Sequence, residues 1–178
     1  MTRRALTTLV VVTLLAGCRE KTPEPESEPA ASVAKVAPAA EPIPDAPTAK
    51  DWNYPTVKWR SADVGLAKMR AEKRPGLVVV MATWCPQCKA YQALFRDPEV
   101  IELSQRFEMI LIDQEQSPER AAQWHTDADY FPRTFFTSPD GAVDPSFVTS
   151  NPSYRHFFNA VQRGEFVAAL RRAIAKYT

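Results

Sequence analysis

The stretch that decides the fold is Leu77-Val78-Val79-Val80-Met81-Ala82, followed at once by Thr83-Trp84-Cys85-Pro86-Gln87-Cys88-Lys89. The unbroken apolar run predicts a strand that is buried on both faces, as in a parallel sheet. The pattern from Lys89 to Phe95 favours a helix, and Pro86 suits a first helical position, where its missing N–H is no loss. We therefore expect Cys85 at the N-terminus of a helix and Cys88 one turn further on.

This placement of two cysteines predicts thiol chemistry. A thiol attacks as its thiolate, and the free N–H groups and dipole of a helix N-terminus favour the anion at Cys85. One turn away, Cys88 is close enough to form a disulfide with Cys85 and so to resolve a mixed disulfide. The two residues are therefore candidate catalytic residues.

Other uses of a Cys-x-x-Cys pair fit the sequence less well. Covalent haem attachment needs a histidine where Lys89 stands. A zinc site needs two further ligands at short spacing, and the two histidines, His125 and His156, are far from each other in the chain. Both histidines are expected to be ordinary surface or loop residues. A structural disulfide remains an alternative, and no metal or cofactor is predicted.

The charge balance argues against a nucleic-acid partner. The chain has 178 residues and a formal net charge of +1 at pH 7. It carries no block of lysine or arginine and no basic stripe.

The first residues have the pattern of an export signal. Arg3 and Arg4 precede an apolar run from Leu6 to Ala16, which is too short to span a bilayer because about twenty residues are needed. The sequence Leu15-Ala16-Gly17-Cys18 resembles a bacterial lipoprotein processing box. This resemblance implies a signal peptide at residues 1–17 and a lipidated Cys18; the alternative is an ordinary cleaved signal followed by an unrelated cysteine. A lipid anchor would place the protein in the bacterial cell envelope, facing the periplasm or the exterior.

Residues 18–50 are expected to be a disordered tether. Seven of the sixteen prolines of the chain lie between Arg19 and Lys50, among Glu, Ala and Lys. Such a segment buries little and favours extended polyproline II.

Residues 51–178 are then long enough for one compact domain. Trp52, Tyr54, Val57 and Trp59 suggest a short opening strand. A helix from Ser61 or Asp63 to about Lys73 is expected next, followed by the buried strand and the cysteine helix. A helix from Pro98 to Arg106 then leads into a strand from Phe107 to Ile112 and a helix near Pro118–Trp124. The last expected elements are a strand from Phe131 to Thr137, in a hairpin with Ala142-Val143, and a terminal helix from Glu165 to Tyr177. This order predicts an α/β sandwich whose parallel strands come first and whose antiparallel edge follows.

The motif Trp84-Cys85-Pro86-Gln87-Cys88-Lys89 after a buried strand, with Pro132 at the start of a later strand, resembles the thioredoxin superfamily. The resemblance covers residues 51–178 and implies a thioredoxin-like sandwich, a central mixed sheet with helices on both faces. Three segments further resemble the small endoplasmic-reticulum thioredoxins of the anterior-gradient group: Asp97-Pro98-Glu99-Val100, Phe131-Pro132-Arg133 and especially Asn151-Pro152-Ser153-Tyr154. Those are thiol-disulfide oxidoreductases or protein-folding factors.

The resemblance implies a role for each site residue. Cys85 corresponds to the attacking thiol and Cys88 to the resolving thiol. Pro132 matches the superfamily's cis-proline beside the cysteine pair, which leaves the backbone of Phe131 open to pair with a substrate segment. Trp84 would form one wall of the site, with ordinary core packing as the alternative.

One feature of the superfamily is missing. Thioredoxins commonly place a buried acidic residue six positions before the first cysteine, as proton acceptor for the resolving thiol, and here that residue is Val79. Asp113 or Glu115 could substitute, although a solvated acid at the end of a strand is the simpler expectation.

The sequence thus predicts a membrane-tethered thiol-disulfide oxidoreductase that acts on exported proteins and exchanges electrons with a membrane redox partner. Its direction (reductase, oxidase or isomerase) is open. The alternatives are a non-catalytic module that binds a protein partner or copper, and a purely structural lipoprotein.

Overall fold

The structure of the protein is a computed structural model that describes residues 49–125 and 128–178. The expected signal peptide, Cys18 and nearly all of the expected tether lie outside these residues. Ala49 and Lys50 belong to the first described element, the 3-10 helix η1 (Ala49–Trp52). Among the described residues, no helix combines the length and the apolar character needed to cross a membrane.

A four-stranded mixed sheet forms the centre of the domain. Its order is β1 (Trp59–Arg60), β3 (Glu108–Asp113), β2 (Gly76–Met81) and β4 (Arg133–Thr137). Both β1 and β2 run parallel to β3, whereas β4 runs antiparallel to β2. The apolar run quoted above is therefore a central strand, and every residue of β2 is buried. The predicted mixed sheet with an antiparallel edge is confirmed.

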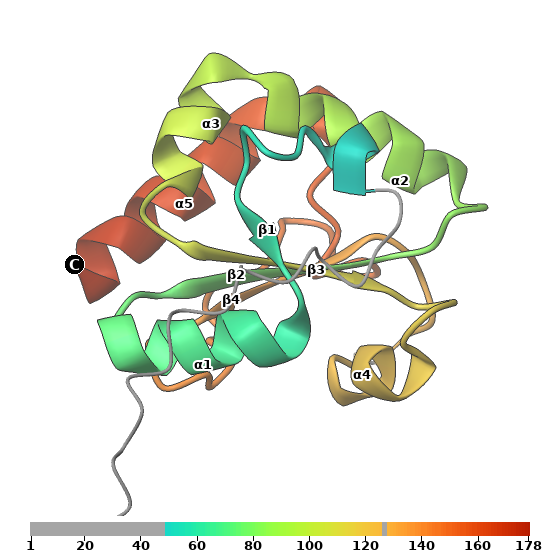
Figure 1. The fold of residues 1–178 in the computed structure, drawn as a ribbon. Coiled ribbons are helices and arrows are strands. Elements are labelled where there is room, and N and C mark those ends of the chain that lie inside the picture. Colours follow the sequence, from blue (N-terminus) through green and yellow to red (C-terminus); the bar gives the residue numbers. More distant parts are fainter. Residues whose placement is uncertain (1–48, 126–127) are drawn as a thin grey trace, which may run out of the picture. The chain divides into compact units, whose positions relative to one another are not determined.

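Helices cover both faces of this sheet (Figure 1). One face carries α1 (Ala62–Glu72) and α4 (Pro118–Gln123). The other carries α2 (Pro86–Tyr91), α3 (Pro98–Ser104) and α5 (Arg163–Tyr177), together with the 3-10 helices η2 (Gln92–Arg96) and η3 (Ala160–Gln162). This arrangement confirms the predicted α/β sandwich.

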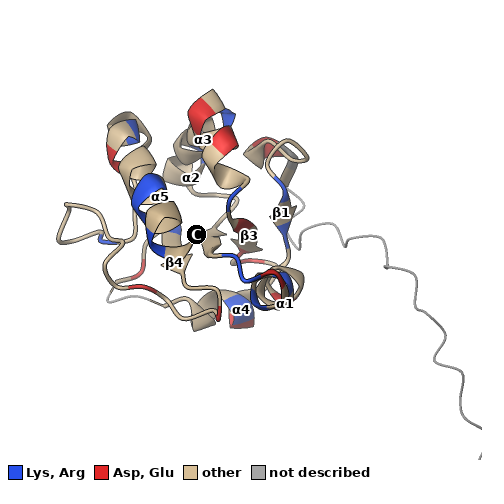
Figure 2. Ribbon diagram, turned by 90° about the vertical axis from the view of Figure 1, so that its left-hand side faces the viewer, with Lys and Arg blue, Asp and Glu red and all other residues tan. Residues whose placement is uncertain are grey.

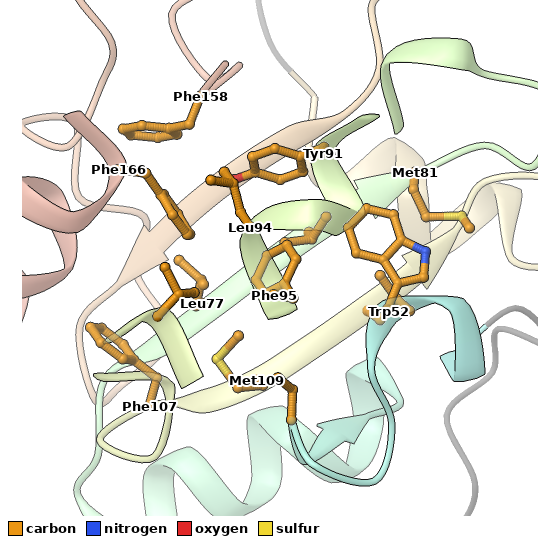
Figure 3. Close-up of a cluster of buried hydrophobic side chains, with 14 of the residues drawn as sticks. Trp52, Leu77, Met81, Tyr91, Leu94, Phe95, Phe107, Met109, Phe158 and Phe166 are labelled. Carbon is orange, nitrogen blue, oxygen red and sulfur yellow. The ribbon is translucent and has the colours of Figure 1, made fainter. Parts of the chain in front are cut away.

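The larger of two hydrophobic cores lies between the sheet and the helices α2, α3 and α5 (Figure 3). Trp52, Tyr91 and Phe95 form its aromatic centre, with ring centroids 5.4 to 6.1 Å apart. The smaller core lies under α1 and α4, and its members include Val78, Val80, Ile110, Ile112, Trp124 and Phe135. Because side chains alternate along a strand, odd-numbered residues of β2 and β3 point to the larger core and even-numbered residues to the smaller.

The N-terminal aromatic residues do not form the predicted strand. Trp52 ends a 3-10 helix, and only Trp59–Arg60 pairs with the sheet. The two tryptophans pack edge to face, with centroids 6.0 Å apart, and the indole N–H of Trp59 donates to the carbonyl of Trp52 at 2.7 Å. Their spacing therefore reflects packing into the core.

Other elements are also shorter than predicted: α3 ends at Ser104 instead of Arg106, and β4 begins at Arg133 instead of Phe131. The cysteine helix is α-helical only to Tyr91 and continues as the 3-10 helix η2. The hairpin after β4 consists of one isolated antiparallel bridge between Thr137 and Val143.

Both edges of the sheet offer little free backbone. The edge strand β1 has two residues. Along β4, the N–H of Thr134 donates to the carbonyl of His156 at 2.7 Å, and the carbonyl of Phe136 accepts from Asp144 at 2.9 Å. A loop thus occupies positions on this edge where another strand would pair.

Ion pairs join α3 to α5. Acidic residues on α3 and basic residues on α5 are visible in Figure 2. Arg163 binds Asp97, the N-cap of α3, at 2.5 Å and Glu99 at 2.6 Å, and Arg171 binds Glu99 at 2.6 Å. Hydrogen bonding to Arg163 lowers the pKa of Asp97 to about 2.

Candidate active site

The site lies where β2 ends and α2 begins. Ala82 is buried, whereas Thr83 and Trp84 are exposed. Cys85 is the N-cap of α2, with an extended backbone, and Pro86 takes the first helical position as predicted. The N–H of Cys85 donates to the carbonyl of Ala82 at 3.2 Å, which turns the chain from the strand into the helix.

The two cysteines face each other in the reduced state. Both are free thiols and both are buried, with exposed fractions of 4% for Cys85 and 1% for Cys88. The backbone N–H of Cys88 donates to Sγ of Cys85 at 3.1 Å. An N–H directed at sulfur stabilises negative charge there. On its other side, Sγ of Cys85 lies 3.4 Å from the carbonyl oxygen of Phe131.

Cys88 is the more protected thiol. Burial, the hydrogen bond with Cys85, and the negative charges of Cys85 and Asp113 together raise the pKa of Cys88 far above its ordinary value, against a smaller opposing effect of the Ala82 backbone. Cys88 is therefore a thiol at neutral pH and needs a proton acceptor before it can attack.

The residues expected to form a substrate groove, Trp84, Phe131 and Pro132, lie beside Cys85. The peptide bond between Phe131 and Pro132 is cis, which confirms the expectation from the thioredoxin resemblance. The ring of Phe131 meets the indole of Trp84 edge to face at 5.9 Å. Trp84 is 62% exposed, so the core-packing alternative for it is wrong.

One charged residue beside Phe131, Arg133, was not predicted from the sequence as a site residue. The guanidinium of Arg133 is buried and lies 4.7 Å from the ring centroid of Phe131. Burial lowers the pKa of Arg133, and its ion pair with Asp129 is long, at 3.9 Å. The motif residue Pro132 was the signal for this position, because Arg133 follows it directly.

Glu115 fixes the loop that leads into the cysteines. Its carboxylate accepts the N–H of Thr83 at 3.0 Å and also the hydroxyl of Thr83. The sequence named Glu115 as a candidate base, but the structure gives it this positioning contact.

Asp113 corrects an expectation. The sequence favoured a solvated acid at the end of the strand, whereas Asp113 has no exposed surface. One oxygen, Oδ1, accepts the N–H of Glu115 at 2.9 Å. The other, Oδ2, is buried with no hydrogen-bond partner among the described residues. The expectation was wrong because a residue at the end of a strand is usually solvated, whereas α2 and the loop after β3 cover Asp113.

A buried hydrogen bond connects the cysteine helix α2 to the sheet. The hydroxyl of Tyr91 hydrogen-bonds that of Thr134 at 2.9 Å, and both residues are fully buried. This bond fixes α2 against β4, the strand that directly follows Phe131 and Pro132.

Beside Cys88 is a cavity of about 230 Å³. Its lining residues are Asp51, Met81, Ala82, Thr83, Cys88, Lys89 and Gln92. Cys88 is the one cysteine of the pair among these lining residues.

The two histidines have the loop positions that the sequence predicted. His125 is exposed, and His156 is half-buried and stacked on Phe135 at 4.6 Å. Across residues 49–125 and 128–178, no three His, Cys, Asp or Glu side chains are grouped so as to hold a metal ion.

This chain is similar to known thioredoxin-like proteins. A family model described as thioredoxin-like matches residues 58–139. A thioredoxin from Thermus thermophilus superposes with a TM-score of 0.54 at 23% identity, covering 68% of this chain and 89% of its own. A disulphide isomerase from Xylella fastidiosa Temecula1 gives a TM-score of 0.40 at 21% identity, covering 65% of this chain and 84% of its own. Residues 58–139 thus match a thioredoxin-like model, and the described residues have a thioredoxin-like fold.

Proposed function

We propose that this protein is a thiol-disulfide oxidoreductase that acts on exported proteins through Cys85 and Cys88. The observation that carries the proposal is the hydrogen bond of 3.1 Å from the Cys88 N–H to Sγ of Cys85. This hydrogen bond connects Cys85 and Cys88 within one helical turn, and it directs an N–H donor at Sγ of Cys85, the sulfur that attacks.

The proposed reaction has two exchanges. The Cys85 thiolate attacks a disulfide of the substrate, an S–S bond forms between the two proteins, and the substrate releases one sulfur as a thiolate. Cys88 then loses its proton and attacks Sγ of Cys85, which closes the Cys85–Cys88 disulfide and releases the second substrate thiolate. Two electrons pass to the substrate, and a partner with two thiols must reduce the Cys85–Cys88 disulfide again. If the partner instead oxidises the cysteine pair, the same steps run in reverse and the substrate is oxidised.

The groove supports a polypeptide substrate. Trp84 is exposed, Phe131 is half-buried, and both lie beside Cys85. Aromatic side chains of this kind contact large apolar area at low entropic cost. A segment of a protein that carries cysteine next to apolar residues fits this surface.

We also propose that Cys18 is lipidated and tethers the domain to a bacterial envelope membrane, where a membrane redox partner exchanges electrons with it. This proposal rests on the processing-box resemblance and the proline-rich segment that follows. A Cys18→Ser variant is expected to move from the membrane fraction to the soluble fraction while its activity in solution is kept. Retention of the variant in the membrane fraction would contradict the anchor.

The catalytic proposal is tested by insulin reduction and by reactivation of a scrambled protein. Wild type is expected to act in at least one of these assays and Cys85→Ser in neither. A Cys88→Ala variant is expected to accumulate mixed disulfides with substrate proteins. Equal activity of wild type and Cys85→Ser would reject the enzyme and favour the alternative, a module that binds a protein partner or copper.

A further inference from the structure

The guanidinium of Arg133 is buried beside the groove with too few partners. Arg133 is the first residue of β4 and is only 3% exposed. Its Nε is enclosed and has no hydrogen-bond partner among the described residues. Its ion pair with Asp129 is 3.9 Å long, which is beyond hydrogen-bond distance. Burying a cation in this way is costly, because its donors have lost water and gained little in return.

Packing alone does not account for a charge at this position. The guanidinium lies 4.7 Å from the ring centroid of Phe131, and a cation over a ring is attracted to it. The ring, however, does not replace hydrogen-bond acceptors for the five N–H donors of an arginine. An apolar side chain of similar length would cover the same ring without burying a charge. The charge of Arg133 therefore needs an explanation of its own.

The contact with Asp129 shows from which side another group can reach Arg133. The Asp129 side chain is 91% exposed, and its Oδ1 is the atom 3.9 Å from Nη1 of Arg133. The guanidinium is thus approached from solvent at Nη1. A long pair with an exposed carboxylate contributes little, so a carboxylate of another molecule can replace Asp129 at small cost.

Phe131 connects this cation to the reacting sulfur. Its carbonyl oxygen lies 3.4 Å from Sγ of Cys85, and its ring lies under the guanidinium of Arg133. An extended segment advances about 3.3 Å per residue. A substrate segment whose cysteine meets Cys85 therefore brings residues a few positions away within reach of Arg133. Among their side chains, a carboxylate matches the paired donors of a guanidinium.

Resting on the proposed function, we propose that Arg133 is a specificity-determining residue that selects polypeptide segments with an aspartate or glutamate a few positions from the cysteine. The substrate carboxylate displaces Asp129 and accepts N–H donors of the guanidinium. Trp84 and Phe131 contact apolar side chains of the same segment. The substrates are thereby narrowed to exported proteins whose cysteine has both apolar and acidic neighbours.

The test uses synthetic peptides with one cysteine, held in a mixed disulfide with thiopyridine, an uncharged group whose release is followed by absorbance. The peptides come in pairs that differ only by glutamate or glutamine at one position, from four before to four after the cysteine. The second-order rate constant with the reduced protein is measured for each, and the glutamate value is divided by the glutamine value. We expect this ratio to reach about ten in wild type at one or two positions, the scale of one hydrogen bond between charged groups.

Three variants assign the preference to Arg133. Arg133→Met keeps an apolar cover for Phe131 and should bring the ratio to about one, whereas a merely structural role would slow both peptides equally and keep the ratio. Lys89→Met removes an exposed cation of α2 and should keep the wild-type ratio. Asp129→Asn, a change on an exposed side chain, removes the competing carboxylate and should raise the ratio about twofold.

The outcomes separate the two proposals. The role of Arg133 would be overturned, with Cys85 still the attacking thiol, by a wild-type ratio near one at every position or by a wild-type ratio in Arg133→Met. An equal fall in Lys89→Met, or no rise in Asp129→Asn, would overturn it as well. Release that is no faster in wild type than in Cys85→Ser, with either peptide of a pair, would overturn the proposed function itself.

Discussion

The indole of Trp84 stands edge-on to the ring of Phe131, with an interplanar angle of 88° and 5.9 Å between centroids. Phe131 in turn places its carbonyl oxygen 3.4 Å from Sγ of Cys85. These contacts connect an exposed aromatic surface directly to the sulfur proposed to attack.

Trp84→Ala is expected to separate protein substrates from small disulfides. Removing the indole takes away contact area for a polypeptide but no group from the exchange itself. The kcat/KM for a protein substrate should fall about tenfold, which corresponds to roughly 1.4 kcal/mol of lost binding. The rate with dithiobis(nitrobenzoate) should stay within about twofold. An equal fall for both substrates would show that Trp84 supports the fold instead of the substrate.

The raised pKa of Cys88 predicts an alkaline loss of stability in the reduced protein. The folded state holds the Cys88 proton at pH values where the unfolded state, with an ordinary thiol pKa of about 8.5, has released it. The contribution is present below about pH 8.5 and is lost as the pH rises, at up to about 1.4 kcal/mol per pH unit.

Urea unfolding in reductant between about pH 8.5 and 9.5 checks this, because tyrosine, with an ordinary pKa of about 10, stays mostly protonated in that range. Tyr91 and Tyr177, whose pKa values are also raised by burial, add their own losses above that range. Cys88→Ala is expected to flatten the decline. An unchanged slope in that variant would mean that Cys88 is not the responsible group.

The lowered pKa of Asp97 predicts an acid-side effect of the opposite sign. Its folded pKa of about 2 lies below the ordinary value of about 3.9, so its contribution is present above pH 3.9 and is lost as the pH falls toward 2. Arg163 has a side chain that is 42% exposed, so solvent weakens the pair and we expect about 1 kcal/mol. Asp97→Asn keeps a capping oxygen, removes the charge and should lose this pH dependence in urea unfolding. Glu102→Gln, an exposed residue on the same helix, should retain it.

Gly65 is the place where α1 comes closest to the sheet. A Cβ at this position would overlap the Cγ1 and Cδ1 atoms of Ile110. Alanine improves helix propensity by about 1 kcal/mol, but overpacking costs about 1 to 3 kcal/mol, so Gly65→Ala should lower the free energy of unfolding. Gly164 lies in the first turn of α5, where an added Cβ would meet no atom within 4 Å. Gly164→Ala should therefore leave the free energy of unfolding unchanged or raise it. Calorimetry of both variants decides the point.

The sequence predicted the parts of the fold that local chemistry determines. The run of valines at Val78–Val80 could only be a buried strand, and Pro86 and Pro98 marked helix starts. The cysteine pair followed from those elements, and the cis bond before Pro132 from the thioredoxin resemblance.

The errors arose where tertiary contacts outweigh local pattern. Trp52 and Trp59 alternate with polar residues as a strand would, yet they pack on one another inside the core. Asp113 was expected in solvent because acids usually end strands there, but the following loop folds back over it. Neither outcome is encoded within a few residues of the position concerned.

The blocked edges of the sheet have a consequence for how copies of this domain behave at high concentration. An open strand invites the same strand of another molecule, and this is how sheets grow into aggregates. Here the edge strand β1 is only two residues long. On the opposite edge, backbone groups of β4 are hydrogen-bonded to Asp144 and His156. The domain is thereby guarded against self-templated growth, while the indole of Trp84 beside Cys85 stays exposed.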